Sequence, residues 1–393
     1  MHTIQRNIPL LKIDAFLSGL WPLSALTVIY FEQITHSYAL AMLVWSLSAI
    51  TQTLTEIPTG IFSDKIGRRR TLMLAAASII LCFTLWALAG QLHAPWLLFI
   101  GAICWGLSDS FLSGTQEALI YETMAELNKP KEFAILYAKI NFWMQFSLAI
   151  SAVFAAIITY CFSLQALAWL SVLPIAGQLV TAYLFVEPKR TTKQHQVPSL
   201  SHFLIALKNL WVNKKLRFYA FFIIFYDSIA YAYTRIEAAY FQTLIKDWMI
   251  NIMRFIKQVS GMIGFMLLPH LRRFTSVRLF FFAITLNEFL RAIGVALNNA
   301  LSPIIMSLVN IGRGLALPSK NDILQQEFSA DQRATMQSIM EAFKGIFGAV
   351  IAYLLGFFAD LSGPRIVIIS TVGIKFALIF GAMFLIQSKK KKT

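Results

Sequence analysis

Long apolar runs separated by short polar segments dominate this sequence. Of its 393 residues, 58% are hydrophobic and only 13% are charged, whereas a soluble globular protein carries roughly 25% charged residues. A helix needs about 20 mostly apolar residues to cross a bilayer. Twelve stretches meet this condition: 10–31, 38–62, 71–92, 95–124, 133–160, 163–186, 216–244, 250–270, 277–298, 301–325, 334–360 and 365–387. The sequence therefore predicts an all-α membrane protein with twelve transmembrane helices.

Lysine and arginine are distributed unevenly between the two sides of these spans. With the N-terminus in the cytoplasm, 23 of the 34 basic residues fall in cytoplasmic segments, and two, Lys246 and Arg365, fall outside. Cytoplasmic loops of membrane proteins carry this kind of positive excess. We expect both termini on the cytoplasmic side of a bacterial inner membrane. The net charge of +15 then reflects membrane topology and gives no reason to expect nucleic-acid binding.

One long polar connection divides the spans into two groups of six. Residues 187–215 are polar and basic, so we expect them to be a cytoplasmic linker between two six-helix halves, 1–186 and 216–393. A weak internal repeat agrees with this division, because an offset of 204 residues aligns the stretch 60–71 with 264–275. Two halves related by an axis along the membrane normal would produce such a repeat.

The loop between the second and third spans has an unusual composition. The stretch "GIFSDKIGRRRT" (60–71) places one acid and four bases between apolar runs and keeps two glycines. The basic run 65–70 alone would orient the hairpin, but orientation requires neither Asp64 nor the glycines. Gly67 permits a tight turn between two helices joined by a short loop, and Gly60 would let a neighbouring helix approach closely.

These residues resemble the signature of the major facilitator superfamily, G-x-x-x-D-x-x-G-R-R/K. The matching positions are Gly60, Asp64, Gly67, Arg68 and Arg69. Together with the twelve spans and the long central loop, the resemblance covers the whole chain. It implies a secondary transporter that rocks two halves around a central site and so exposes that site to each side of the membrane in turn.

The resemblance also implies a cytoplasmic gate around the same loop. In such a gate, Asp64 interacts with the start of the eleventh span. Arg68 pairs with an acid at the inner end of the fourth span, for which the candidates are Glu122 and Glu126. These contacts would join the two halves on the cytoplasmic side while the site faces outward. The alternative is that the basic residues only orient the hairpin.

Acidic side chains within the fourth span are candidates for proton coupling. Asp109 and Ser113 lie one turn apart on one stripe of the expected helix, and Glu117 lies on the adjoining stripe. A charge in the bilayer is costly, and desolvation favours the protonated carboxyl, which brings proton exchange within reach. We therefore predict that Asp109 and Glu117 couple transport to protons. Alternatively, a base such as Lys139 or Arg313 holds Asp109 as a fixed ion pair.

Charged residues in the second half are candidates for lining the substrate cavity. The predicted set is Asp227, Arg235, Arg313 and Glu341. Aromatic residues around Asp227 suit a cationic or aromatic substrate, and Arg313 could hold an anionic group or pair with Asp109.

Local neutralisation is the competing interpretation for several of these charges. Asp227 and Arg235 could neutralise each other, and Glu341 could pair with Lys344 three residues away. The same spacing favours a local pair between Glu288 and Arg291 in the ninth span. Lys375 in the twelfth span has no assigned role.

The sequence offers no motif for catalysis. It contains no zinc-ligand spacing, phosphate-binding glycine loop or nucleophile elbow, and its three cysteines lie unpaired in apolar runs. We therefore expect no enzyme and no cofactor, but a monomer that carries a small molecule and uses protons as coupling ion. Efflux is favoured because acids outline the cavity and no sugar- or peptide-type motif is present. The alternatives are a proton-linked importer and, less favoured, a receptor or scaffold that does not transport.

Overall fold

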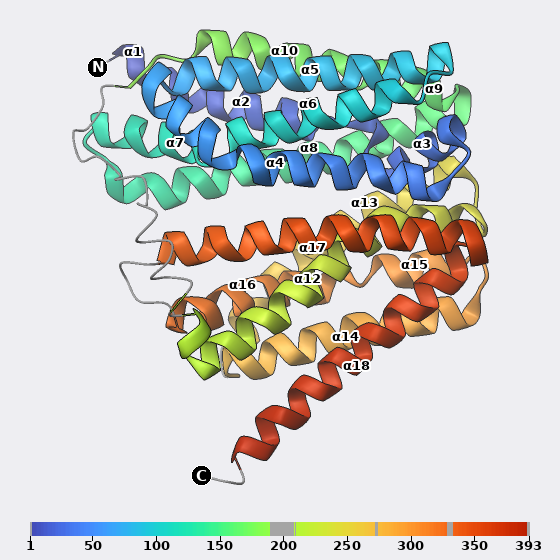
Figure 1. Cartoon of the computed structure of the whole chain (residues 1–393). Helices are drawn as coiled ribbons and strands as arrows, with labels where there is room; N and C mark the ends of the chain where they lie inside the picture. Colours follow the sequence, from blue (N-terminus) through green and yellow to red (C-terminus); the bar gives the residue numbers. More distant parts are fainter. Residues whose placement is uncertain (1, 189–207, 209, 272–273, 328–332, 391–393) are drawn as a thin grey trace. The chain divides into compact units, whose positions relative to one another are not determined.

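A computed structural model of the chain describes residues 2–188, 208, 210–271, 274–327 and 333–390 (Figure 1). All regular secondary structure in these ranges is helical. The prediction of an all-α protein is confirmed. Most of the predicted linker 187–215, and residues 272 and 273 in the second copy of the repeat, lie outside the described residues.

The helices pack into two compact units. Unit 1 contains Met1–His36 and Leu43–Val197, and unit 2 contains Ser37–Met42 and Pro198–Thr393. The predicted limits of the two halves, 1–186 and 216–393, remain predictions. Each unit is described by itself below.

Unit 1 contains the first six predicted spans. Its elements are α1 (His2–Gln5), α2 (Asn7–Gly19), η1 (Pro22–Ala25), α3 (Thr27–Thr35), α4 (Tyr38–Ile66), α5 (Arg68–Leu92), α6 (Trp96–Leu112), α7 (Thr115–Glu126), η2 (Pro130–Glu132), α8 (Phe133–Cys161), α9 (Leu164–Leu170) and α10 (Val172–Leu184). Helix α4 belongs to this unit from Leu43 onward. Helix α5 packs along α6 and α10, and α2 packs along α8 (Figure 1). A cluster of aromatic rings fills the space between the helices, with Trp86 and Trp105 stacked at a centroid distance of 5.4 Å.

Unit 2 contains the last six predicted spans. Its elements are α12 (Lys214–Gln242), α13 (Asp247–Leu267), η3 (Leu268–Leu271), α14 (Ser276–Leu297), α15 (Ser302–Ser307), α16 (Asn310–Glu327), α17 (Arg333–Ser362) and α18 (Pro364–Lys390). Helix α12 packs along α17, and α16 packs between α13 and α14. The side chain of Asn213 caps α12, because its oxygen accepts hydrogen bonds from the backbone N–H groups of Lys215 and Leu216.

Eight of the helices in the described residues are long and apolar enough to cross a membrane. They correspond to the second to sixth, ninth, eleventh and twelfth predicted spans. The other four predicted spans correspond to α2 with α3, to α12, to α13, and to α15 with α16. Two of these are interrupted, and two carry charged residues in their interior.

Four spans that we expected to be continuous are broken. The first is interrupted between Gly19 and Thr27, where Pro22 provides no backbone N–H to continue the helix. The fourth is interrupted at Ser113 and Gly114, and the tenth between α15 and α16. The sixth is interrupted at Ser171, between α9 and α10. In membrane proteins, broken helices occur where the backbone is buried in protein or lines a cavity.

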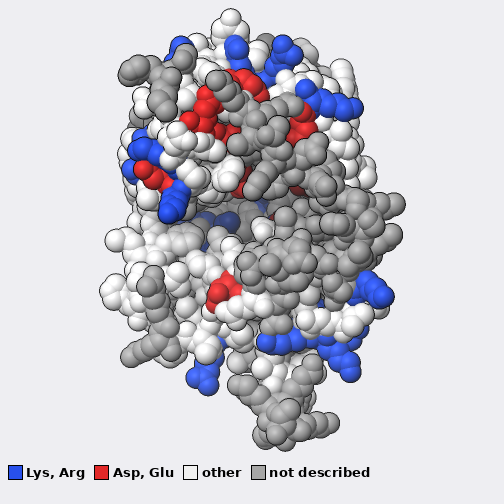
Figure 2. All heavy atoms as spheres, turned by 90° about the vertical axis from the view of Figure 1, so that its left-hand side faces the viewer, with Lys and Arg blue, Asp and Glu red and all other residues white. Residues whose placement is uncertain are grey.

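Basic and acidic side chains gather at helix ends in each unit. Figure 2 shows the face that is on the left in Figure 1, where basic and acidic side chains lie on the surface. In sequence, acids lie at the end of α7 in unit 1 and bases at the start of α12 in unit 2. The distribution agrees with a charged cytoplasmic surface. The orientation of the termini in the membrane remains a prediction.

Candidate functional site

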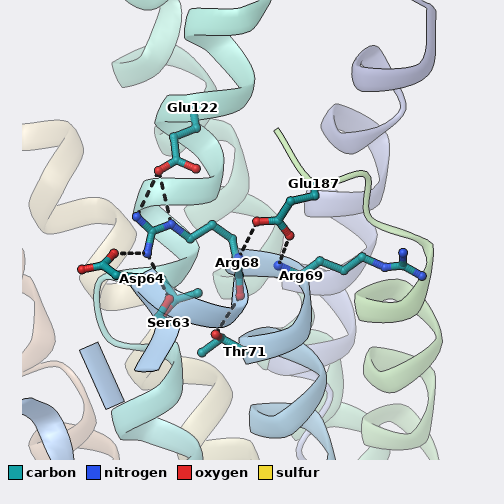
Figure 3. A network of polar contacts seen from close by, with 9 residues as sticks. Ser63, Asp64, Arg68, Arg69, Thr71, Glu122 and Glu187 are labelled. Carbon is teal, nitrogen blue, oxygen red and sulfur yellow. Dashed lines mark hydrogen bonds and ion pairs between the residues drawn. The ribbon is translucent and has the colours of Figure 1, made fainter. Parts of the chain in front are cut away.

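Arg68, at the start of α5, is the centre of a polar network in unit 1 (Figure 3). Its guanidinium donates to the carboxylate of Glu122 on α7 at 3.1 and 3.2 Å. It also donates to Asp64 at 2.8 Å and to the hydroxyl of Ser63 at 3.0 Å. Of the two acids considered for Arg68, the structure pairs it with Glu122. The role of this network as a gate remains a prediction.

Glu187 caps α5, a contact that sequence reasoning missed. Its two carboxylate oxygens accept hydrogen bonds from the backbone N–H groups of Arg68 and Arg69 at 2.7 and 2.8 Å. These N–H groups have no helical acceptor, and a negative charge is stabilised at a helix N-terminus. The side chain of Arg69 lies 5.0 Å from the ring centroid of Tyr183 on α10 and points away from Asp64 (Figure 3).

The two glycines of the motif have different surroundings. Gly67 has φ of +100°, so the predicted tight turn is present, and a Cβ there would lie 2.7 Å from the carboxylate of Glu187. A Cβ on Gly60 would meet no described atom within 4 Å. No described helix of unit 1 approaches Gly60 closely, and an approach by a helix of the other unit stays a prediction. The partner predicted for Asp64, at the start of α17, belongs to the other unit, and that contact stays a prediction.

The proposed coupling residues lie on opposite sides of the break in the fourth span. Asp109 is in the last turn of α6 and accepts a hydrogen bond of 2.8 Å from the indole N–H of Trp105. Glu117 is in the first turn of α7 and accepts one of 2.9 Å from the hydroxyl of Tyr137. The continuous stripe of polar residues that we expected does not form, because Gly114 has φ of +71° and interrupts the helix.

Polar residues of α4 form hydrogen bonds with residues of the fourth span at this break. The hydroxyl of Thr59 donates to the carbonyl of Ser110, near the end of α6, at 3.1 Å. The hydroxyl of Ser113 donates to the carboxylate of Glu56 at 3.1 Å. A third acid, Glu56, therefore lies at the break. Its position before Pro58 in the second span was visible in the sequence, but its proximity to Ser113 was not.

In unit 2, Asp227 and Glu341 line the same cavity. Its volume is about 40 Å³, which is room for about one water molecule. Lys320 donates to Asp227 at 2.7 Å, and Lys344 pairs with Glu341. The expected local pair between Glu341 and Lys344 is confirmed. The partner expected for Asp227 was wrong, because Lys320 takes the place proposed for Arg235.

The two predicted arginines lie elsewhere in the same unit. The guanidinium of Arg235 lies 5.2 Å from the ring centroid of Tyr231. Arg313 is exposed in the first turn of α16, between two glycines that pack against neighbouring helices. The cavity of Asp227 and Glu341 includes neither arginine. The structure therefore does not bring the four predicted cavity residues into one small pocket.

A buried ionic cluster explains Lys375. The carboxylate of Glu288 on α14 pairs with both Arg291 and Lys375, and it accepts a hydrogen bond of 2.9 Å from Tyr226. The ammonium of Lys375 lies 4.4 Å from the ring centroid of Tyr226, and Arg291 lies 4.5 Å from that of Tyr233. The expected local pair of Glu288 and Arg291 is confirmed. Lys375 joins it across the packed helices α14 and α18.

Among the described residues, no group of three or more His, Cys, Asp or Glu side chains could hold a metal ion. The polar groups of both units are instead arranged as ion pairs, helix caps and hydrogen-bonded acids. Such groups can hold charge, release protons or bind polar ligands within a membrane.

Known proteins with similar sequences or structures are membrane transporters. A "Na(+), Li(+), K(+)/H(+) antiporter" of Planococcus maritimus is 25% identical over 169 residues, which are 42% of this chain and 39% of that protein. The chain thus matches about two fifths of this curated relative. A point mutant of the nucleoside transporter NupG has a TM-score of 0.80 at 16% identity, covering 96% of this chain and 99% of NupG.

The fucose:proton symporter FucP of E. coli has a TM-score of 0.59 at 14% identity, covering 97% of this chain and 99% of FucP. At these identities, both structures establish the fold alone. The profile of the Major Facilitator Superfamily matches residues 15–352. The chain belongs to the Major Facilitator Superfamily and is a multi-pass membrane transporter, not an enzyme.

Proposed function

We propose that this transporter expels a small molecule from the cell in exchange for protons. The observation that carries the proposal is the interrupted fourth span, with Asp109 before the break, Glu117 after it and Glu56 beside it. Discontinuous helices form the coupling-ion sites of many secondary transporters. Carboxyl groups in such a place can take up a proton on one side of the membrane and release it on the other.

The partial relative gives independent support for proton exchange. This relative is an antiporter that exchanges monovalent cations for protons, and it matches this chain over 169 residues. We adopt from it only the exchange of a substrate for protons, because the match is partial. The network of Arg68, Glu122 and Asp64 is proposed as the cytoplasmic gate. In this gate the network holds Asp64 in place, Asp64 contacts the start of the eleventh span in the other unit, and loss of that contact allows the two units to rock.

Everted membrane vesicles provide the test. Respiration acidifies their interior, and a pH-sensitive dye reports the gradient while cationic drugs, amino acids, organic acids and siderophores are added one at a time. Exchange predicts that at least one compound collapses the gradient, and that vesicles without the protein show no collapse. If no compound does so, proton-coupled efflux is contradicted and uptake into right-side-out vesicles tests the proton-linked importer.

Two matched variants locate the coupling site. Asp109→Asn is expected to abolish the collapse, because an amide cannot carry the proton. Asp322→Asn removes an exposed carboxylate near the end of α16 that bonds to Ser276 and Gln326, and it should leave the collapse intact. Equal collapse in both variants would contradict the role of Asp109.

A further inference from the structure

A groove lies between the start of α12 and the end of α18. Its volume is about 670 Å³, and sites that hold small organic molecules have volumes of about 300–1,000 Å³. Every residue that lines it belongs to one of these two helices, and α18 diverges from α14 toward the same end (Figure 1). Several lining residues, including Phe225 and Leu385, are exposed. The groove therefore opens on the surface of unit 2.

The wall of the groove on α12 has a basic end and an aromatic remainder. Its lining residues follow the i, i+3, i+4, i+7 spacing of a single helical face. In chain order they are Lys214, Arg217, Phe218, Phe221, Phe222 and Phe225. The two bases lie at the start of α12, and the four phenylalanines lie in the turns that follow. A matching ligand therefore has a negatively charged group joined to a long apolar part.

The wall on α18 is apolar and contains several small residues. Ala377, Gly381 and Ala382 line the groove there, and the other lining residues of this helix are leucines. A Cβ on Gly381 would meet no described atom within 4 Å, so space remains beside this face of α18. None of the residues that line the groove is acidic. The two bases of α12 therefore have no acidic counterpart inside it.

The side chain of Arg217 is held by Trp211, which precedes α12. Its guanidinium donates a hydrogen bond of 3.0 Å to the carbonyl of Trp211 and lies 5.7 Å from the centroid of that ring. The ring of Trp211 contacts that of Phe221 at a centroid distance of 5.8 Å. A guanidinium has five N–H donors, so Arg217 keeps donors for a ligand. In the described part of unit 2, neither Lys214 nor Arg217 forms an ion pair with an acid.

The basic end of the groove has the composition of a membrane–water interface. Trp211 and Val212 are exposed there beside Lys214, and tryptophan is enriched where a bilayer meets water. From Arg217 to Phe225 the groove follows eight residues of α12, or about 12 Å. The hydrocarbon of one leaflet is about 15 Å thick, which is half of the bilayer core. The groove thus extends from the level of the headgroups through most of one leaflet.

We propose that this groove binds an anionic phospholipid. The phosphate group accepts hydrogen bonds from Lys214 and Arg217, and an acyl chain lies between the phenylalanines of α12 and the small residues of α18. A guanidinium matches phosphate oxygens in a two-point hydrogen bond, and basic pockets between membrane helices bind anionic headgroups. In the predicted orientation of the chain, this lipid belongs to the cytoplasmic leaflet.

The charges disfavour other occupants of the groove. Residues 189–207 contain three bases and no acid, and residues 391–393 contain two lysines. These segments of the chain therefore offer no counter-charge for Lys214 and Arg217, and a second copy of the chain presents the same basic end. A small soluble anion would satisfy the two bases but would leave the phenylalanines uncovered.

Lipid binding to the purified full-length protein tests the proposal. The protein is delipidated in detergent, and native mass spectrometry counts the lipids that rebind during a titration. The probes are phosphatidylglycerol, phosphatidylcholine with the same acyl chains, diacylglycerol without a phosphate, and glycerophosphate without acyl chains. We expect one saturable site for phosphatidylglycerol, with a higher affinity than for phosphatidylcholine or diacylglycerol. The proposal is overturned if the three lipids bind equally, or if glycerophosphate displaces phosphatidylglycerol at equal concentration.

Substitutions of the two bases locate the headgroup. Lys214→Gln and Arg217→Gln are each expected to weaken phosphatidylglycerol binding about fivefold, and the double variant about thirtyfold, because each base near a membrane surface adds a similar amount to the binding of anionic lipid. Arg278→Gln, at the exposed start of α14 and outside the groove, is the control and should bind like the unmodified protein. Unchanged affinity in the double variant, or an equal loss in the control, refutes the headgroup site.

Two glycines of α18 provide a matched pair that locates the acyl chain. Gly381→Leu places a side chain inside the groove, whereas Gly373→Leu adds the same side chain at an exposed position outside it. A Cβ meets no described atom within 4 Å at either glycine, so both variants should fold. We expect Gly381→Leu alone to weaken phosphatidylglycerol binding, and equal binding by the two variants overturns the assignment.

The mass of the same variants in detergent separates a lipid site from a contact between copies of the chain. If the unmodified protein is a dimer that Gly381→Leu converts to a monomer, the groove is an interface between copies and the lipid proposal is overturned. None of these assays needs a proton gradient, so their outcome is independent of the proposed proton exchange.

Discussion

The buried cluster around Glu288 predicts opposite effects for two charge-removing substitutions. Glu288 and Lys375 are fully buried, and Arg291 is 5% exposed. One carboxylate therefore faces two cations. Glu288→Gln would leave Arg291 and Lys375 facing each other without a counter-charge. Breaking a buried ion pair from one side costs about 3–5 kcal/mol. For a unit of this size, that corresponds to a decrease in Tm on the order of 10 °C.

Lys375→Met should have a much smaller effect, between neutral and stabilising. After this change, Glu288 still pairs with Arg291 and accepts the hydrogen bond from Tyr226. The Nζ of Lys375 makes no well-formed hydrogen bond in the described structure. Removing this group therefore leaves no hydrogen-bond acceptor without a donor. Replacing a buried ion by an apolar side chain of similar volume is often neutral or stabilising. We expect a change within about 1 kcal/mol, or a gain.

Thermal unfolding of the purified variants, followed by tryptophan fluorescence, measures both effects. Lys344→Met is the matched control, because its partner Glu341 is 50% exposed, and such pairs contribute about 0–1 kcal/mol. The reasoning is refuted if Lys375→Met destabilises as much as Glu288→Gln. That result would mean that the second cation is required for the packing of α14 against α18.

The other predictions concern the hairpin, the helix break and the coupling residues. Gly67→Ala should cost about 1–2 kcal/mol or more, because φ is +100° and the new Cβ would meet the carboxylate of Glu187; an unchanged Tm contradicts this. Gly114→Ala, with φ of +71° in open space, should cost only the backbone strain of about 1 kcal/mol, and a loss several times larger would indicate a steric contact. Asp109→Asn should stop substrate-dependent proton movement in vesicles without lowering Tm, whereas retained movement excludes it as a coupling residue. Asp64→Asn should change the initial transport rate if the gate is real, and an unchanged rate removes it from the gate.

The sequence predicted the features that depend on local patterns. Apolar runs determine the helices, and the motif with Gly67 and Arg68 determined the turn and pointed to Glu122 as one of two candidate partners. Glu341 with Lys344 and Glu288 with Arg291 are three residues apart, so one turn of a helix brings each pair together. The family resemblance followed from the same local motif.

Long-range partners could not be predicted in this way. Glu187 caps Arg68 across 119 residues of sequence, and Lys375 reaches Glu288 only because α14 packs against α18. The break at Gly114 was also missed, because its polar neighbours fit a continuous helical stripe equally well. Only the packing of α4 shows which backbone and side-chain groups accept hydrogen bonds there.

Proton-driven transport by the pure protein is the most direct test of the central claim. The protein is reconstituted in liposomes with an acidic interior, and accumulation of an external compound that collapses the gradient in everted vesicles is followed over time, with the membrane potential clamped. The account predicts accumulation above the external concentration, dependent on the pH gradient and abolished by an uncoupler or by Asp109→Asn. Equilibration to equal concentrations, at a rate independent of the gradient, would contradict proton exchange.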